Sequence, residues 1–207
     1  MYLGRALNLR AHHDMELDHL LGRAWAKFGV YRKELTNKNY PLKQRMRLFN
    51  AVITPSVLYG CCSWVMTKTR AQRLRTTQRK MLRSILGKGR KSIEMSDQSS
   101  TMDSVGVPDW VEEQQRRKWR WCGHVCRRLD GRWPTKLLNF VPTSGRRSQA
   151  HPKARWTDDI AMFLAKAYGK NDASLGGSFE ECSHSAMDRG IWSNLESDFV
   201  NFCRDRA

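Results

Sequence analysis

Apolar residues recur at helical spacing through most of the chain. Leu17, Leu20, Ala24 and Phe28 lie three or four positions apart, which predicts a helix over residues 14–35. The same spacing recurs in later segments, whereas alternating or β-branched runs typical of strands are scarce and no internal repeat is visible. The pattern therefore predicts a mainly α fold.

The first half of the chain is expected to hold two more helices. One begins at Pro41, since proline suits a first helical turn, and ends or kinks at Pro55. The nearly apolar run 57–66 follows and is too short to span a bilayer, so we expect it to be the most buried segment. Residues 69–86 form the clearest amphipathic helix, which Gly87 should end.

The second half alternates helical patterns with polar stretches. Helices are expected from 108 to about 129, over 156–168 and near 186–203, with Gly131 and Pro134 breaking the first of them. Residues 92–106 contain Ser, Asp and Gly and are typical of a linker, and residues 142–153 form a basic loop.

Charge is distributed unevenly along the 207 residues, which carry a net charge of +17. Residues 61–91 hold ten Lys and Arg without one acid, and residues 111–156 hold twelve against three acids. An acidic, Ser-rich stretch separates these blocks. Such concentrated positive charge favours phosphate contacts through counterion release, which indicates a nucleic-acid partner. Membrane binding is disfavoured because the basic helices have no apolar face to spare once the core is filled.

The cysteines and the N-terminal segment give information on the cellular compartment. Residues 1–5 have no apolar signal-peptide core, so an intracellular protein is expected. Its six cysteines would then be mostly reduced, and adjacent Cys61 and Cys62 do not form a disulfide framework.

Arginine and lysine side chains on two helices are candidates for phosphate contacts. Arg75, Arg79 and Arg83 follow one another at four-residue spacing and form a ridge on helix 69–86. Further bases gather opposite the apolar face of helix 108–129, and two lie in the basic loop. The candidate contacts are Arg73, Arg75, Arg79, Lys80, Arg83, Arg116, Arg117, Arg120, Arg127, Arg146 and Arg147.

Tryptophans interleaved with these arginines are candidates for stacking on unpaired bases. Trp121 falls on the predicted inner face with Cys122 and Val125, so we expect it in the core. Trp119 lies off that face and is the stronger stacking candidate.

Cysteine and histidine residues on the same helix raise an alternative function. Cys122 and Cys126 loosely fit structural zinc spacing, with His124 between them, although on a helix His124 points away from Cys122. A zinc-binding nucleic-acid module, or a metal-dependent nuclease using His124 with Asp158 and Asp159, is therefore the alternative. The simpler interpretation takes Cys122 as a small buried apolar residue and His124 as part of a turn.

Several short motifs follow one another in a specific order. They are Tyr2-Leu3-Gly4, Leu58-Tyr59-Gly60, the segment 78–87, the segment 115–128 with its Gly123-His124 pair, Arg155-Trp156-Thr157-Asp158-Asp159-Ile160, and Asp188-Arg189 with Trp192. Their order resembles the thumb and tail of non-LTR (LINE-type) retrotransposon reverse transcriptases. In that family this region grips the template–primer duplex and holds element RNA or target DNA.

The resemblance implies a division of the chain and a set of partners. Residues 1–91 would form a thumb-like helical bundle, 92–107 an acidic linker and 108–207 a smaller, basic helical tail domain. Expected partners are RNA, DNA or an RNA–DNA hybrid, together with the palm and fingers of the parent enzyme, and the expected location is nuclear or nucleus-associated.

The resemblance also implies what chemistry to expect. It begins where the polymerase palm ends, and no aromatic-Ala-Asp-Asp segment is present. The aspartates that hold two Mg²⁺ ions for polymerisation would therefore belong to a missing palm. We expect no catalytic residue, no cofactor and no polymerase activity from this chain alone.

Overall fold

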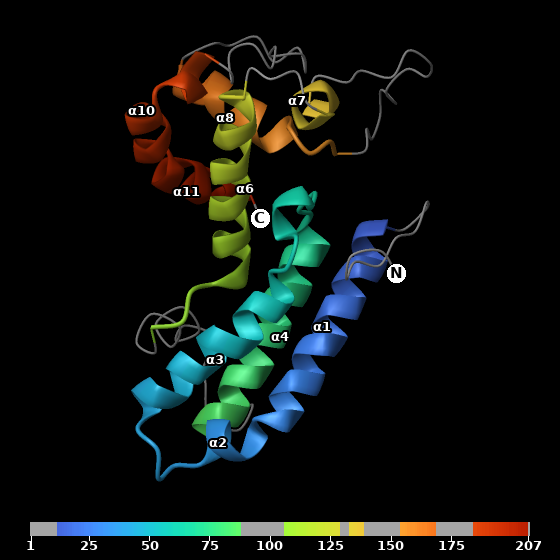
Figure 1. Cartoon of the computed structure of the whole chain (residues 1–207), viewed down its shortest axis with the longest axis vertical. Helices are drawn as coiled ribbons and strands as arrows, with labels where there is room; N and C mark the ends of the chain where they lie inside the picture. Colours follow the sequence, from blue (N-terminus) through green and yellow to red (C-terminus); the bar gives the residue numbers. More distant parts are fainter. Residues whose placement is uncertain (1–11, 88–105, 129–132, 139–153, 169–183, 207) are drawn as a thin grey trace. The chain divides into compact units, whose positions relative to one another are not determined.

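The chain is mainly α-helical, as the sequence predicts. A computed structural model describes residues 12–87, 106–128, 133–138, 154–168 and 184–206. These residues form helices and irregular segments, with no β-strand among them (Figure 1). No helix in the described ranges is long and apolar enough to cross a membrane. The predicted loop residues Arg146 and Arg147 and the linker 92–105 lie outside the described residues.

The first of two compact units is built from long helices. It holds α1 (His12–Val30), α2 (Arg32–Thr36), α3 (Leu42–Val57), α4 (Lys68–Leu86) and the beginning of α6 (Trp110–Cys126). Helix α1 contacts both α3 and α4, and Figure 1 shows them running side by side.

The second unit contains shorter helices around the rest of α6. It holds α6 from Gln115 onward, α7 (Trp133–Leu138), α8 (Asp158–Ala167), α10 (Arg189–Asn194) and α11 (Glu196–Arg206), together with residues 62–65. The division between the units falls inside α6, so residues 108–114 group with the first unit and not with the tail domain expected to begin at 108.

Helix α4 begins and ends close to its predicted limits because both ends are capped. The Thr67 hydroxyl accepts a hydrogen bond from the backbone N–H of Arg70 at 3.3 Å. Gly87 ends the helix with φ of 67°, a left-handed conformation that glycine adopts without strain. Its N–H donates to the carbonyl of Ser84. The predicted apolar face is buried at Ala71, Leu74, Met81 and Ile85.

Other helices differ from their predicted limits. The helix expected over 14–35 is interrupted at Tyr31, between α1 and α2, and the helix expected over 186–203 is interrupted at Leu195, between α10 and α11. The predicted effects of proline are close to what is observed: α3 ends at Val57, two residues after Pro55, and α6 ends at Cys126, before Gly131 and Pro134. Pro134 then lies in the first turn of α7, where a missing N–H costs little.

The core of the first unit forms where α1, α3 and α4 meet. Ala24, Phe49, Ile53 and Leu74 are fully buried there. In the apolar run 57–66, Val57, Leu58 and Cys61 of this unit are buried as predicted, and so is Trp64, which belongs to the second unit. Tyr59 is about half exposed.

A buried arginine joins helix ends in the first unit. The Arg45 guanidinium donates hydrogen bonds to the backbone carbonyls of Leu35, Tyr40 and Ile85, at 3.3, 3.1 and 2.8 Å. The last carbonyls of a helix have no partner within the helix, so a buried cation here satisfies groups near the ends of α2 and α4.

Gln78 attaches the beginning of α6 to α4. Its side-chain amide donates to the Pro108 carbonyl at 2.7 Å and accepts from the Trp110 N–H at 3.1 Å. The Trp110 indole then donates to the Thr54 hydroxyl and stacks on Phe49 at 5.9 Å between ring centroids. Nearby, Gln114 donates to the Cys61 carbonyl at 3.2 Å.

Two tryptophans form the centre of the second unit. The rings of Trp119 and Trp192 stack with centroids 3.8 Å apart and planes 7° from parallel. Each indole N–H donates to the other residue's carbonyl, at 2.8 and 3.1 Å. Gly123 allows this approach, because a Cβ there would lie 2.4 Å from Nε1 of Trp192. Phe163 and Phe199 complete the cluster.

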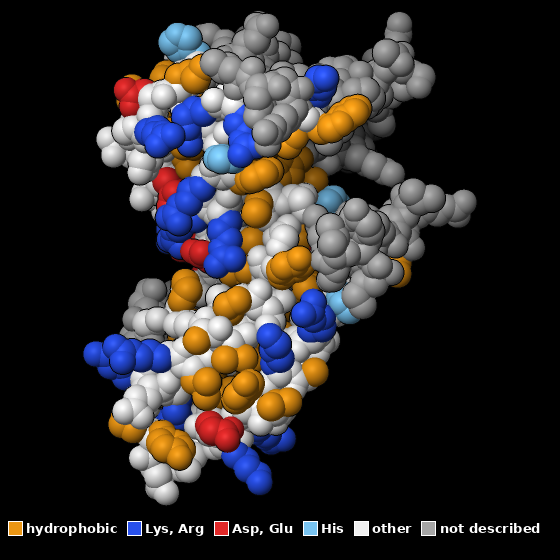
Figure 2. Space-filling model, viewed as in Figure 1, with side chains coloured by type: hydrophobic (Ala, Val, Ile, Leu, Met, Phe, Trp, Pro, Cys, Tyr) orange, Lys and Arg blue, Asp and Glu red, His pale blue; other side chains and the backbone are white. Residues whose placement is uncertain are grey.

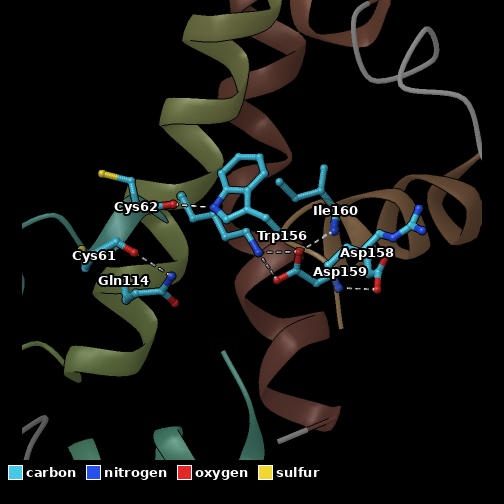
Figure 3. A network of polar contacts seen from close by, with 9 residues as sticks. Cys61, Cys62, Gln114, Trp156, Asp158, Asp159 and Ile160 are labelled. Atoms are coloured by element: carbon cyan, nitrogen blue, oxygen red, sulfur yellow. Dashed lines mark hydrogen bonds and ion pairs between the residues drawn. The ribbon is translucent and has the colours of Figure 1, made fainter. Parts of the chain in front are cut away.

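A buried ion pair attaches α8 to α6. The Lys118 ammonium lies 2.7 Å from both carboxylate oxygens of Asp159 and 5.0 Å from the centroid of the Trp156 ring. The Trp156 indole donates to the Cys62 carbonyl at 2.6 Å (Figure 3). Because Lys118 is only 1% exposed, these partners take the place of water around its ammonium group.

Replacing Gly123 with Ala should destabilise the second unit. The added Cβ would overlap the Trp192 indole, and overpacking of this kind costs about 1–3 kcal/mol. Gly22→Ala is the matched control. Nothing lies within 4 Å of a Cβ at Gly22, so alanine there should stabilise helix α1 by about 0.5–1 kcal/mol. Urea unfolding followed by circular dichroism measures both changes, and equal midpoints for Gly123→Ala and the wild type would contradict the packing described.

Lys118→Met should lower the free energy of unfolding by about 2 kcal/mol or more, since it leaves Asp159 without its cation. Adding Asp159→Asn to this variant should recover part of the loss, because the uncompensated charge disappears. Lys166→Met, which changes an exposed lysine of α8, should shift stability by no more than about 0.5 kcal/mol. Additive losses in the double variant would show that the two charges do not interact.

Candidate nucleic-acid interface

A hollow lined mainly by arginines lies in the second unit. Its volume is about 650 Å³. We call it the arginine hollow, and its lining consists of Arg120, His124, Arg127, Arg128, Arg189, Trp192, Ser193 and Glu196. Figure 2 shows Lys and Arg side chains gathered on the visible face of this unit, over α6, α10 and α11.

Helical spacing brings these residues to one place. Arg120 and His124 are four positions apart on α6 and so share a face, and Arg127 and Arg128 follow directly after the helix ends at Cys126. Across the hollow, residues 189, 192, 193 and 196 are separated by three, one and three positions from α10 into α11. The stacked Trp119 and Trp192 hold α6 against α10, so the two rows face the same hollow.

The lining is strongly positive, with four arginines against one acid. The acid is Glu196, which pairs with Arg120 through two hydrogen bonds of 2.7 and 2.6 Å. The Arg120 side chain is 63% exposed and the Glu196 side chain 16%, so the guanidinium lies at the water-facing side of the pair. A phosphate would compete with Glu196 for this guanidinium, because both anions accept paired N–H donors.

Two other arginines of the hollow differ in how they are held. One guanidinium nitrogen of Arg127 donates to the Ala186 carbonyl at 2.8 Å, which fixes its direction. Arg189 is exposed and forms no hydrogen bond or ion pair with any residue that the structure describes. Arg189 therefore has its donors available to a ligand.

The tryptophans of α6 exchange their predicted places. Trp119 is fully buried, so its assignment as the stacking residue was wrong, and Trp121, assigned to the core, is 41% exposed. The predicted inner-face residues Val111, Cys122 and Val125 are buried, so Trp121 is the described member of that face that was placed wrongly. Lys118 and Trp119 are buried as well, and Asp159 neutralises the Lys118 charge inside the unit. Trp121 instead stacks on His124, with ring centroids 5.7 Å apart.

The predicted ridge of α4 is partly used in ion pairs of the first unit. Arg73 pairs with Asp18, and Arg75 lies 3.0 Å from Asp109 with both side chains 18% exposed. Arg79 is half-buried, and its Nε is enclosed without a hydrogen bond among the described residues. The remaining predicted bases differ in exposure: Lys80 is exposed, and Arg83, Arg116 and Arg117 are half-buried.

Potential metal ligands do not converge in the described part of the chain. Cys122 and Cys126 are buried with their sulfurs 3.9 Å apart, whereas His124 is exposed in the arginine hollow. No group of three or more His, Cys, Asp or Glu residues suited to a metal ion occurs among the described residues. Burial also raises the pKa of the Cys203 thiol to about 12, which disfavours a thiolate there.

The proposed nuclease residues are likewise occupied by local contacts. Asp158 accepts a hydrogen bond from the Arg155 N–H at 2.8 Å, as expected near a helix start. Asp159 binds Lys118 and accepts from the Ile160 N–H. Figure 3 shows Asp158 and Asp159 directed to these partners. The geometry does not support their joint action with His124.

Half of the arginine hollow was not predicted as a site. Arg128, Arg189, Ser193 and Glu196 were not singled out as contacts, although Arg189 belongs to the Asp188-Arg189 motif with Trp192. That motif is now explained locally. The Asp188 side chain caps α10 by accepting from the N–H groups of Gly190 and Ile191, and Trp192 packs on Trp119. Arg189 is thereby placed beside the arginines of α6.

Comparison with known proteins identifies one informative relative. A protein of Caenorhabditis elegans described as transposon-derived is 31% identical to this chain over 201 residues, which cover 93% of this chain and 67% of that protein. No family model and no solved structure matches the chain. The similarity extends through both compact units, and the chain therefore belongs to a family of transposon-derived proteins.

Proposed function

We propose that this chain is the nucleic-acid-binding thumb and post-thumb region of a LINE-type retrotransposon reverse transcriptase. It holds RNA, DNA or an RNA–DNA hybrid mainly by phosphate contacts and does not polymerise by itself. The transposon-derived relative supports an origin in a mobile element. The order of the motifs from Leu58-Tyr59-Gly60 to Gly123-His124 supports the narrower assignment.

The observation that carries this proposal is the arginine hollow. Four guanidinium groups around a single carboxylate attract an anion, and guanidinium groups match phosphate oxygens through paired donors. The surrounding helix α6 belongs to a block of twelve bases and three acids, so the positive potential extends beyond the hollow. This extended distribution of basic residues favours a polyanion over a small anion as the ligand.

A second, weaker surface is proposed on α4. Lys80 and Arg83 form no ion pair with a described residue, so they remain available for phosphates in the way the sequence suggested. Arg73 and Arg75 are poorer candidates because Asp18 and Asp109 already neutralise them.

Arg189→Glu should weaken binding to a labelled RNA–DNA hybrid, because a phosphate contact is lost and a repelling charge is added. The decrease of log K with log salt should become shallower, by about 1 or more in slope. Arg155→Glu is the control, since it makes the same change at an exposed position of the same unit outside the hollow. Fluorescence anisotropy at several salt concentrations measures both. An equal loss in the two variants would show that only total charge matters and not the arginine hollow.

Glu196→Gln should tighten binding. The change keeps the shape of the side chain but removes the anion that competes with phosphate for Arg120. Two unit charges about 4 Å apart in water interact by about 1 kcal/mol, so we expect a gain in affinity of roughly fivefold. The same anisotropy titration measures the gain. Asp198→Asn is a charge-matched control in the first turn of the same helix. Unchanged or weaker binding by Glu196→Gln would contradict phosphate entry at Arg120.

A further inference from the structure

Trp121 has an unusual position for a large apolar side chain. It is 41% exposed although the core of its unit lies on the opposite side of the same helix. Trp119, two residues earlier, already fills that core with Trp192 and Phe199. Trp121 is therefore not required for packing of the cluster, and its exposed ring surface needs another explanation.

The neighbours of Trp121 connect it to the arginine hollow. Its ring stacks on His124, with planes 27° apart, and His124 is exposed and lines the hollow. Arg120 precedes Trp121 directly and lines the hollow as well. We call Trp121 and His124 the aromatic rim. The rim offers an aromatic surface for stacking, and the hollow beside it offers arginine N–H groups that can donate hydrogen bonds to a phosphate.

This combination differs from what a duplex needs. The bases of a duplex are stacked on one another and cannot reach an aromatic side chain unless they are unpaired. A duplex would therefore contact only the arginines, through its phosphates. A single strand uses both, because each unpaired base has a π face free to stack while its phosphate contacts the arginines. Arg and aromatic side chains placed together are typical of single-strand binding grooves.

We infer that the aromatic rim and the arginine hollow together bind an unpaired nucleotide of a single-stranded RNA or DNA. The base extends the stack formed by Trp121 and His124, and the adjoining phosphate lies among Arg120, Arg128 and Arg189. The inference rests on the proposed function and narrows its ligand from nucleic acid in general to a single-stranded segment. No sequence preference is expected, because stacking is available to every base.

The test compares strands that differ only in their bases. The probes are a labelled twelve-nucleotide oligoadenylate, as RNA and as DNA, and a strand of the same length and charge built from abasic sites. The full chain should bind the strand with bases about fivefold or more tightly than the abasic strand, from the usual range of one stacking contact. Trp121→Ala should remove this difference, and Trp121→Phe should retain most of it.

Trp25→Ala is the matched control. Trp25 is 40% exposed, nearly the same as Trp121, but lies on α1 in the first unit and packs against Phe28. It should leave the ratio between the two probes unchanged. Helical circular dichroism and thermal melting of each variant show that the fold is kept.

The outcomes separate this inference from the proposed function. Equal binding of the two probes by the wild type would overturn the stacking site and leave phosphate binding intact. The same would follow if Trp25→Ala reduced the ratio as much as Trp121→Ala. Failure of a folded wild type to bind either probe or a duplex would overturn the proposed function and the inference with it.

Discussion

The reciprocal contact between Trp119 and Trp192 is the interaction on which the second unit depends. Each indole both stacks on its neighbour and donates to the neighbour's backbone carbonyl, so two buried polar groups and two large apolar surfaces are satisfied by one pair. Gly123 belongs to the same arrangement, because only a residue without a side chain admits the Trp192 ring. The Gly-His and Asp-Arg-x-x-Trp motifs, 65 positions apart between Gly123 and Asp188, are thus two halves of one contact.

The arginine hollow follows from this contact. Once α6 and α10 are held by their inner faces, four arginines from these helices and from the residues just after α6 lie around one hollow, which is unfavourable unless the charges are compensated. Glu196 compensates Arg120, and the Ala186 carbonyl accepts from Arg127. Arg189 forms no such contact with a described residue, and the described lining holds four arginines and one acid. This excess of basic side chains is the reason for proposing a nucleic-acid site here.

Much of the fold could be predicted from the sequence, and the errors have identifiable causes. Helix α4 was placed correctly because its apolar period and its terminal Gly87 agree, whereas its Thr67 cap was not predicted. The inner face of α6 was predicted correctly at Val111, Cys122 and Val125. The burial of Trp119 was missed because it depends on contact with Trp192, 73 positions away in sequence.

Only part of the candidate site could be predicted, because its remaining residues are brought together by contacts between segments distant in sequence. Arg120 and Arg127 follow from the basic block of α6, but Arg189 and Glu196 lie in a segment of net negative charge that gave no reason to expect a phosphate site. Their role depends on tertiary packing of α10 against α6. The ridge of α4 was predicted in position, but sequence could not show that Asp18 and Asp109 would pair with Arg73 and Arg75.

The most direct test of the account is the salt dependence of binding between the purified chain and a labelled RNA–DNA hybrid, with a chelator present in a parallel series. The account predicts submicromolar binding at low salt, a steep linear decrease of log K with log salt, and no effect of the chelator. A well-folded chain that does not bind, or whose binding is insensitive to salt, would contradict the claim that its basic helices hold nucleic acid through phosphate contacts.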